Sequence, residues 1–291
     1  MNDTLESLRR KMTRAGELLS VVRTMKALAA ASIGQYERAM RSLGDYSRTV
    51  EMGLSIACRD RTIPPPTLNH STQERIGAIA YGTDQGLTGQ FNETLADFAV
   101  QFLATIPGSK TVWAMSERVG AHFEDAGLPI TGSFPPPHAI TSISSHIGQI
   151  LNRLEPLLRA EQVTTLYLFH NAPQPGAIYK PVLQRLLPFD QAWLNSLWQA
   201  PWPTRNQPEA LLGSHVTRQA LLTEYLFVSL FRACAESLAS ENAARLAAMQ
   251  RAEKNIGEMQ DNLTHAFHRL RQDSIDAELF DVSAGFEALK E

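Results

Sequence analysis

SENAARLAAMQRAEKNIGEMQDNLTHAFHRLRQDSIDAELFDVSAGFEALKE, residues 240–291, is the most informative segment of this sequence about its fold. It contains no proline, and its apolar residues recur in alternating steps of three and four. They are Met249, Ala252, Ile256, Met259, Leu263, Ala266 and Leu270. This narrow apolar seam predicts one long helix that lies against another helix. A helix of about 80 residues would be ~120 Å long, which is too long for a compact globule to enclose.

The positions of the prolines predict a second long helix at the other end of the chain. All sixteen prolines lie between Pro64 and Pro208. Residues 1–63 and 209–291 therefore lack the residue that costs a helix interior about 3 kcal/mol or more. We expect each of these two segments to form a coiled-coil helix.

The N-terminal segment carries a seven-residue repeat in which fourteen of sixteen positions are apolar. The positions are Leu5, Leu8, Met12, Ala15, Leu19, Val22, Lys26, Ala29, Ile33, Tyr36, Met40, Leu43, Ser47, Val50, Leu54 and Ala57. Such a repeat predicts a left-handed coiled coil, and the simplest partner is the C-terminal helix of the same chain. The alternative is a stripe that packs on an ordinary globular core.

Residues 72–208 show the alternation of an α/β domain. Residues 63–71, IPPPTLNHS, precede this domain as a stiff linker. Strands are predicted at residues 76–81, 110–115 and 163–170, helices at residues 92–106, 116–126 and 141–160, and one or two strands with loops at residues 177–200. The predicted fold class is α/β with long helices. It combines an antiparallel two-helix coiled coil of the N- and C-terminal helices with a Rossmann-like domain built on a largely parallel sheet.

Composition limits the classes of partner and the compartment. The net charge of -3 gives no broad attraction to nucleic acid or anionic lipid. Two cysteines, Cys58 and Cys234, fit a reducing compartment better than a disulfide framework. No apolar run is long enough for a transmembrane helix, and MNDTLESLRRKM lacks the apolar core of a secretion signal. The simplest location is therefore a bacterial cytoplasmic face.

The sequence predicts no catalytic, cofactor-binding or metal-binding residue. The turn GTDQGLTGQFN at residues 82–92 precedes a helix that could seat a phosphate, but it has neither nucleotide-binding glycine spacing nor a following lysine. We interpret it as a tight strand-to-helix turn. His265 and His268 lack an HExxH context, and we interpret them as solvated. The acidic residues Asp273, Asp276, Glu278 and Asp281 are expected to form a solvated helix face.

Motifs at both ends of the chain carry a resemblance to a known family. They read SENAARLAAM at residues 240–249, RQDSIDAEL at 271–279 and AGFEAL at 284–289. The chain resembles the gamma subunit of the F-type ATP synthase, whose pattern there is SE.AAR..AM, RQ..IT.EL and.SG..AL. RTMKALAAAS at residues 23–32 aligns with that family's opening, and DQGLTGQFN at 84–92 resembles its D.GLCGG.N turn.

The resemblance implies a non-catalytic central rotor that couples the movement of protons or sodium ions to ATP synthesis or hydrolysis. The coiled coil would turn inside a ring of alpha and beta subunits, and the α/β domain would lie against the epsilon subunit and the ring of membrane c subunits. By motif position, the resemblance also implies contacts with the beta subunit. The residues are Met25, Arg245, Arg271, Gln272, Asp276 and Glu278.

Several residues depart from the family pattern. The lysine-rich opening TQKIT.AM..VAA.K is ELLSVVRTMKALAAAS here, and Ser32 replaces its final lysine. The cysteine and the second glycine of the GLCGG turn are Thr88 and Gln90, and Asp276 stands where threonine is usual. These departures indicate a divergent branch, of the alternative-operon kind found beside a standard synthase in some bacteria.

A second hypothesis is a coiled-coil scaffold whose α/β domain binds a small ligand, such as a nucleotide, at the turn of residues 82–92. A third, a free-standing hydrolase, has only the general α/β pattern in its favour, and a fold pattern does not establish function.

Overall fold

The structure is a computed structural model that describes residues 4–57, 75–199, 202, 205–206 and 213–288. The linker expected at residues 63–71 and Cys58 lie outside the described residues. The chain separates into two units. The first unit holds Met1–Ala30 with Arg245–Glu291, and the second holds Ala31–Ala244.

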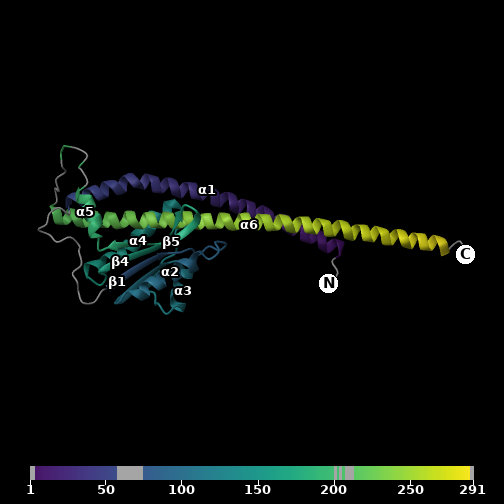
Figure 1. Cartoon of the computed structure of the whole chain (residues 1–291), viewed down its shortest axis with the longest axis horizontal. Helices are drawn as coiled ribbons and strands as arrows, with labels where there is room; N and C mark the ends of the chain where they lie inside the picture. Colours follow the sequence, from purple (N-terminus) through teal and green to yellow (C-terminus); the bar gives the residue numbers. More distant parts are fainter. Residues whose placement is uncertain (1–3, 58–74, 200–201, 203–204, 207–212, 289–291) are drawn as a thin grey trace. The chain divides into compact units, whose positions relative to one another are not determined.

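The two predicted long helices are present. They are α1 (Leu5–Ala57) and α6 (Ser214–Ala288), which are drawn purple to blue and green to yellow in Figure 1. None of the sixteen heptad positions of α1 is exposed, which confirms the predicted repeat. In the second unit, Tyr46 of α1 donates a hydrogen bond to Glu224 of α6, and Gly53 lies against Leu221. The later residue on α1 contacts the earlier residue on α6, so the two helices run antiparallel.

The sheet of the second unit has the order β3-β2-β1-β4-β5. The strands are β1 (Arg75–Tyr81), β2 (Ser109–Met115), β3 (Gly132–Ser133), β4 (Thr165–Gln174) and β5 (Ala177–Leu187), and the helices between and after them are α2 (Phe91–Thr105), α3 (Glu117–Asp125), α4 (Ile140–Arg159) and α5 (Gln191–Gln199). The first four strands pair in parallel, as predicted.

The prediction for residues 177–200 was wrong in part, because this region holds one strand and the helix α5. Strand β5 pairs antiparallel with β4. Only two residues connect these strands, and so short a connection can join only antiparallel strands. One of the two is Gly176, with a φ of +79° that suits a tight turn. In α5, Trp193 packs against Phe189 and Tyr225, with ring centroids 5.2 Å and 5.3 Å away, respectively.

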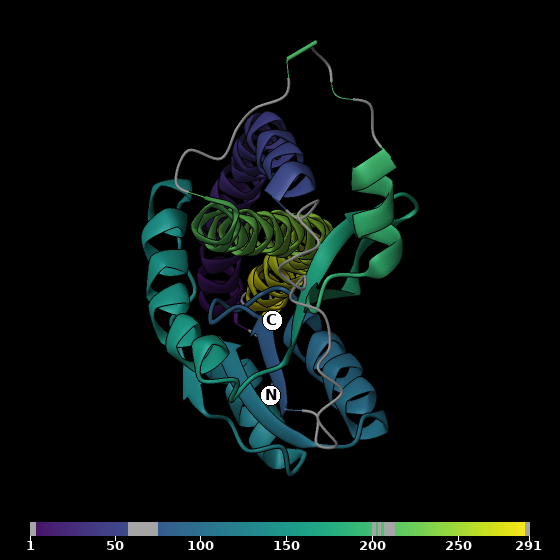
Figure 2. The ribbon, with the colours of Figure 1, turned by 90° about the vertical axis from the view of Figure 1, so that its left-hand side faces the viewer.

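Residues along each strand alternate between two apolar cores. Ile76, Ala78 and Ala80 of β1 face α2 and α3, while Ile79 and Tyr81 face a second cluster that includes α4 and parts of α1 and α6. Figure 2 shows α6 in the space between α1, α4 and the sheet. The long C-terminal helix is therefore part of the domain's own core in this unit, and the sheet is covered on both faces.

Two polar contacts join α6 to the strands. His170 of β4, with a side chain only 3% exposed, places its Nε2 atom 2.8 Å from Oε2 of Glu236. Ser237 donates a hydrogen bond to the carbonyl oxygen of Tyr81 at the end of β1, at 3.3 Å. Buried contacts of this kind fix the helix in one position on the domain, because a shift would leave these polar groups unpaired.

Candidate functional site

In the first unit, α1 and α6 face each other in a regular register. Arg9 lies over the ring of Phe267, with 5.4 Å between the guanidinium carbon and the ring centroid. Seven residues further along α1, a side chain at Gly16 would lie 3.8 Å from Nε2 of Gln260. After seven more, Nε of Arg23 donates to Oε1 of Glu253 at 3.0 Å. The partner on α6 moves back by seven residues each time, so the pair is antiparallel with one constant register.

This register corrects two of the seven predicted seam positions on α6. Met249 and Ile256 are buried, and Leu263 and Leu270 are half-buried, as expected. Met259 is 44% exposed, however, and Ala266 is also exposed. The residues one position later, Gln260 and Phe267, are half-buried in their place. Counting only apolar residues missed Gln260, because a long polar side chain can cover the seam with its apolar stem while its tip reaches a polar group.

A charged cluster crosses the seam at Glu253. Nζ of Lys26 lies 2.5 Å from one carboxylate oxygen of Glu253, and Nε of Arg23 lies 3.0 Å from the other. Hydrogen bonds from Lys26 and then from Arg23 lower the pKa of the Glu253 carboxyl. Lys26 is one of only two heptad positions that are not apolar. Its polarity has a structural reason, because it pairs with a carboxylate on the facing helix.

The six residues expected to contact the beta subunit all belong to the first unit. Four of them, Arg271, Gln272, Asp276 and Glu278, are exposed within about two turns of α6. Met25 on α1 is half-buried. Arg245 is only 7% exposed, so a partner would reach little of it. The structure thus brings four of the six together on an accessible surface, while Met25 and Arg245 lie further along the helices.

Sequence reasoning missed two sets of exposed apolar residues in this unit. We call the first set the α1 stripe: Leu18, Val21 and Leu28 are 54%, 56% and 64% exposed, with Met25 between them in sequence. We call the second set the α6 end patch: Ile275, Leu279, Phe280 and Val282 are 50%, 66%, 73% and 74% exposed. The spacing of the α1 stripe, in steps of three, four and three, could have revealed it as a second helical face outside the heptad. Large exposed apolar side chains in such groups mark interaction surfaces.

The turn of residues 82–92 is filled by its own side chains. The Thr83 backbone N–H donates to Oδ1 of Asn92 at 2.9 Å, and the Asn92 amide donates back to the Thr83 carbonyl oxygen at 2.7 Å. A side chain at Gly82 would lie 2.3 Å from a methyl group of Val119. Ser116 caps α3 as predicted, because its hydroxyl accepts a hydrogen bond from the Val119 backbone N–H. These contacts favour a structural role for the turn.

Other chemistry finds little support in the described part of the chain. No three His, Cys, Asp or Glu side chains gather there as metal ligands would. His265 and His268 are exposed on α6, as are the acidic residues of its last turns. The described helices include none with the length and hydropathy needed to cross a membrane.

Comparisons with known proteins agree over nearly the whole chain. A family model described as ATP synthase matches residues 4–289. The ATP synthase gamma chain of Syntrophus aciditrophicus (strain SB) is 27% identical over 300 residues, which is 98% of each chain. The ATP synthase gamma chain of Anaeromyxobacter sp. (strain Fw109-5) is 29% identical over 303 residues, covering 98% of this chain and 100% of that relative.

Solved structures show the same fold. The rotor of the Euglena gracilis mitochondrial ATP synthase, in rotational state 1, matches with a TM-score of 0.61 and 15% identity, covering 93% of this chain and 98% of that one. A chain of the OSCP/F1/c-ring assembly from the same synthase, in rotational state 3, matches with a TM-score of 0.64 and 16% identity, covering 98% and 94%.

Proposed function

The chain belongs to the ATP synthase family, among relatives that are gamma chains, and on that premise we propose that it is the central rotor of an F-type ATP synthase. In this role it carries no catalytic site. It couples ion movement through the membrane to ATP synthesis or hydrolysis in an alpha–beta hexamer, and its rotation changes the state of the catalytic subunits in turn.

The observation that carries this proposal is the register of the helix pair in the first unit. A shaft that transmits torque must resist sliding and unwinding between its two helices. Along α6, the cation–π contact of Phe267, the approach of Gln260 to Gly16 and the two salt bridges of Glu253 follow one another at intervals of seven residues. Each contact depends on one alignment of α1 with α6, because a slip would separate all of them together.

The surface outside the seam offers two kinds of contact to a surrounding ring of subunits. The α1 stripe and the α6 end patch are apolar, while Arg271, Gln272, Asp276 and Glu278 are polar and exposed. We assign the polar residues to contacts with beta-subunit loops. An exposed ion pair contributes about 1 kcal/mol or less, so such contacts can break and re-form as the shaft turns. Met25 would contact the beta subunit as part of the α1 stripe. Arg245 would contribute to this contact chiefly through its position in α6, because its side chain is nearly buried.

The α/β domain is the part assigned to the epsilon subunit and the c-ring. The Euglena gracilis assembly that contains a chain similar to this one also contains a c-ring. A position against a c-ring would make this chain peripheral to the membrane. In a bacterium the corresponding location is the cytoplasmic face of the inner membrane.

Co-expression tests the proposal directly. The chain is produced with alpha and beta subunits from the same source, and we expect one complex with ATPase activity that depends on this chain. A hexamer that neither binds the chain nor changes its activity in the chain's presence would refute the rotor assignment.

A pair of matched variants then tests the contact surface. Phe280→Asp places a charge in the α6 end patch, where the side chain is 73% exposed, and we expect weaker assembly with an unchanged melting temperature of the chain alone. Ile178→Asp changes an exposed apolar residue, 45% exposed, on β5 and should assemble normally. Gln272→Ala should leave folding intact and alter only the coupling of rotation to ATP turnover. If the Phe280→Asp and Ile178→Asp variants assemble equally well, the α6 end patch does not belong to the interface.

A further inference from the structure

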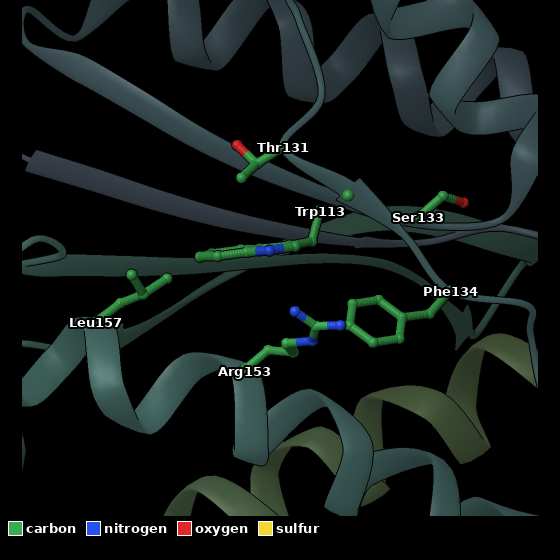
Figure 3. Close-up of a pocket in the computed structure, with 7 residues that line it drawn as sticks. Trp113, Thr131, Ser133, Phe134, Arg153 and Leu157 are labelled. Carbon is green, nitrogen blue, oxygen red and sulfur yellow. The ribbon is translucent and has the colours of Figure 1, made fainter.

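A cavity of about 350 Å³ opens at one edge of the α/β domain, between β2, β3 and α4. Its lining comes from Trp113 of β2, from Thr131, Ser133 and Phe134 along the β3 segment, and from Arg153 and Leu157 of α4. Figure 3 shows Arg153 rising from α4 toward Trp113 and Phe134, with Thr131 and Ser133 on the opposite side of the indole. The described lining of the cavity shares no residue with the turn of residues 82–92, with the α1 stripe or with the α6 end patch.

The walls of this cavity are mainly apolar and flat. The indole of Trp113 forms its centre, and the ring of Phe134 and the side chain of Leu157 lie on either side of the opening. Trp113 is only 6% exposed, so its ring is held in place by the core of the domain. A fixed aromatic wall of this kind suits a planar ring, which can stack on it or meet it edge to face.

Two hydrogen-bond donors of the cavity have no acceptor within the described part of the chain. One is the guanidinium of Arg153, which is exposed on α4 and has no recorded hydrogen bond or ion pair there. The other is the indole N–H of Trp113, which makes no hydrogen bond there and is not fully enclosed by the domain. Both donors are therefore open to the cavity and available to a bound group. Both donors lie on the same cavity, so one bound group can accept from both.

Gly132 keeps the indole N–H accessible. A side chain at this position would lie 3.5 Å from Cδ1 and 3.9 Å from Nε1 of Trp113, and it would cover the nitrogen edge of the ring. Strand β3 is also the edge of the sheet, so no further strand of the described residues covers this side. The opening beside the indole is therefore a consequence of the glycine and of the position of β3.

The charge of the lining selects the ligand. It contains one cationic side chain, two hydroxyl groups and no carboxylate. Arginine binds carboxylate and phosphate groups through parallel hydrogen bonds, and these bonds are stronger than those between neutral groups. The volume is at the lower end of the range of ligand pockets, roughly 300–1,000 Å³, which leaves room for about one ring system and one anionic group.

We propose that this cavity is a binding site for a small anion built on a planar ring, either an aromatic carboxylate or a nucleoside monophosphate. The ring lies against Trp113 and Phe134, and the anionic group accepts hydrogen bonds from Arg153 and from the Trp113 N–H. The site adds a ligand-binding function to the α/β domain beyond its place in the rotor.

Fluorine NMR of the full-length chain tests this site. The chain has four tryptophans, so labelling with 5-fluorotryptophan gives four signals, and the Trp113→Phe variant assigns the one from the cavity. The probes are benzoate, indole-3-acetate, AMP and inorganic phosphate. We expect a saturable shift of the Trp113 signal with at least one ring-bearing anion, no shift of the other three signals, and a much weaker response to phosphate alone.

Two arginine variants provide the control. Arg153→Gln removes the charge of the cavity and should weaken binding at least tenfold. Arg159→Gln changes an exposed arginine on the same helix, which pairs with Glu155 outside the cavity, and should bind as the wild type does. The proposal is overturned if no ring-bearing anion shifts the Trp113 signal saturably, if all four signals shift together, or if both variants bind with equal affinity.

Discussion

Nζ of Lys26 lies 2.5 Å from Oε2 of Glu253, across the seam between α1 and α6. A polar residue at a seam position usually lowers the stability of a coiled coil but specifies its alignment. Arg23 binds the other oxygen of the same carboxylate, so two cations of α1 converge on one anion of α6. This arrangement opposes any slip of one helix along the other, because a shift would separate both pairs.

The cluster at Glu253 makes the stability of the helix pair depend on pH. Its folded-state pKa lies below the usual value for glutamate, chiefly because Lys26 and Arg23 donate hydrogen bonds to it. The stabilisation is therefore present above the pKa of the unfolded chain and is lost as the pH falls through the lower folded pKa. We expect Glu253→Gln to lower the melting temperature at pH 7, and the difference from the wild type to shrink progressively as the pH falls below about 4.

Added salt supplies a second check of this cluster. The groups are partly solvated, so about 1 M salt should reduce the difference between the Glu253→Gln variant and the wild type at pH 7. Thermal melts followed by circular dichroism measure both effects. A difference that persists unchanged at pH 3 and in high salt would mean that the side-chain packing of Glu253, and not its charge, stabilises the pair.

The register of α6 is tested by placing a charge at two neighbouring positions. Ile256 is 9% exposed in the seam, and Ile256→Asp should cost about 3 kcal/mol or more, because it buries a carboxylate without a partner. Met259 is 44% exposed, and Met259→Asp should change the free energy of unfolding by about 0.5 kcal/mol or less. Chemical denaturation measures both. Equal losses of unfolding free energy would mean that Met259 also lies in the seam, as the spacing of the apolar residues alone predicts.

The contrast between the two long helices shows what a sequence pattern can predict. The heptad of α1 was correct at every position, because its seam is almost wholly apolar. On α6, alternate seam positions are occupied by Glu253 and Gln260, which an apolar count excludes. Their place depends on Arg23, Lys26 and the space beside Gly16, all of them over 200 residues away in sequence. Such pairings depend on two segments at once, so one segment alone cannot predict them.

In the α/β domain, too, the sequence predicted some elements and missed others. The first three predicted strands and three predicted helices were placed within a few residues, because each follows its own local periodicity. The antiparallel direction of β5, the helix α5 and the cavity at Trp113 were missed. The cavity depends on the edge position of β3 and on an arginine that α4 brings to it, which are properties of the folded sheet.

The turn after β1 requires a glycine at its first position. A side chain at Gly82 would lie 2.3 Å from Val119 and 2.9 Å from Ser116, so α3 would have to move. We expect Gly82→Ala to cost about 1–3 kcal/mol of unfolding free energy. Gly148 of α4 has nothing within 4 Å of the same position, and Gly148→Ala should stabilise the chain by roughly 0.5–1 kcal/mol through its helix propensity. If Gly82→Ala is no more destabilising than Gly148→Ala in denaturant unfolding, α3 packs differently from this description.

The buried histidine of α4 gives the α/β domain its own response to acid. Burial lowers the pKa of His146 from 6.5 to about 4, and its Nε2 atom has no hydrogen-bond partner among the described residues. Between these two values the unfolded chain binds a proton that the folded chain does not, so the free energy of unfolding falls as the pH falls from 6.5 to about 4. Below that pH this group adds no further loss.

Replacing the histidine tests this response. The rings of Tyr81 and Phe134 lie 6.1 Å and 6.4 Å from the imidazole, measured between ring centroids, so a phenyl ring suits the same site. We expect His146→Phe to retain the fold and to lose roughly 2 kcal/mol less unfolding free energy than the wild type between pH 7 and pH 4. His138→Phe changes an exposed histidine and should keep the wild-type pH dependence. Denaturant unfolding across this range measures the slopes, and parallel slopes for the wild type and both variants would mean that His146 has the same pKa in the folded and the unfolded chain.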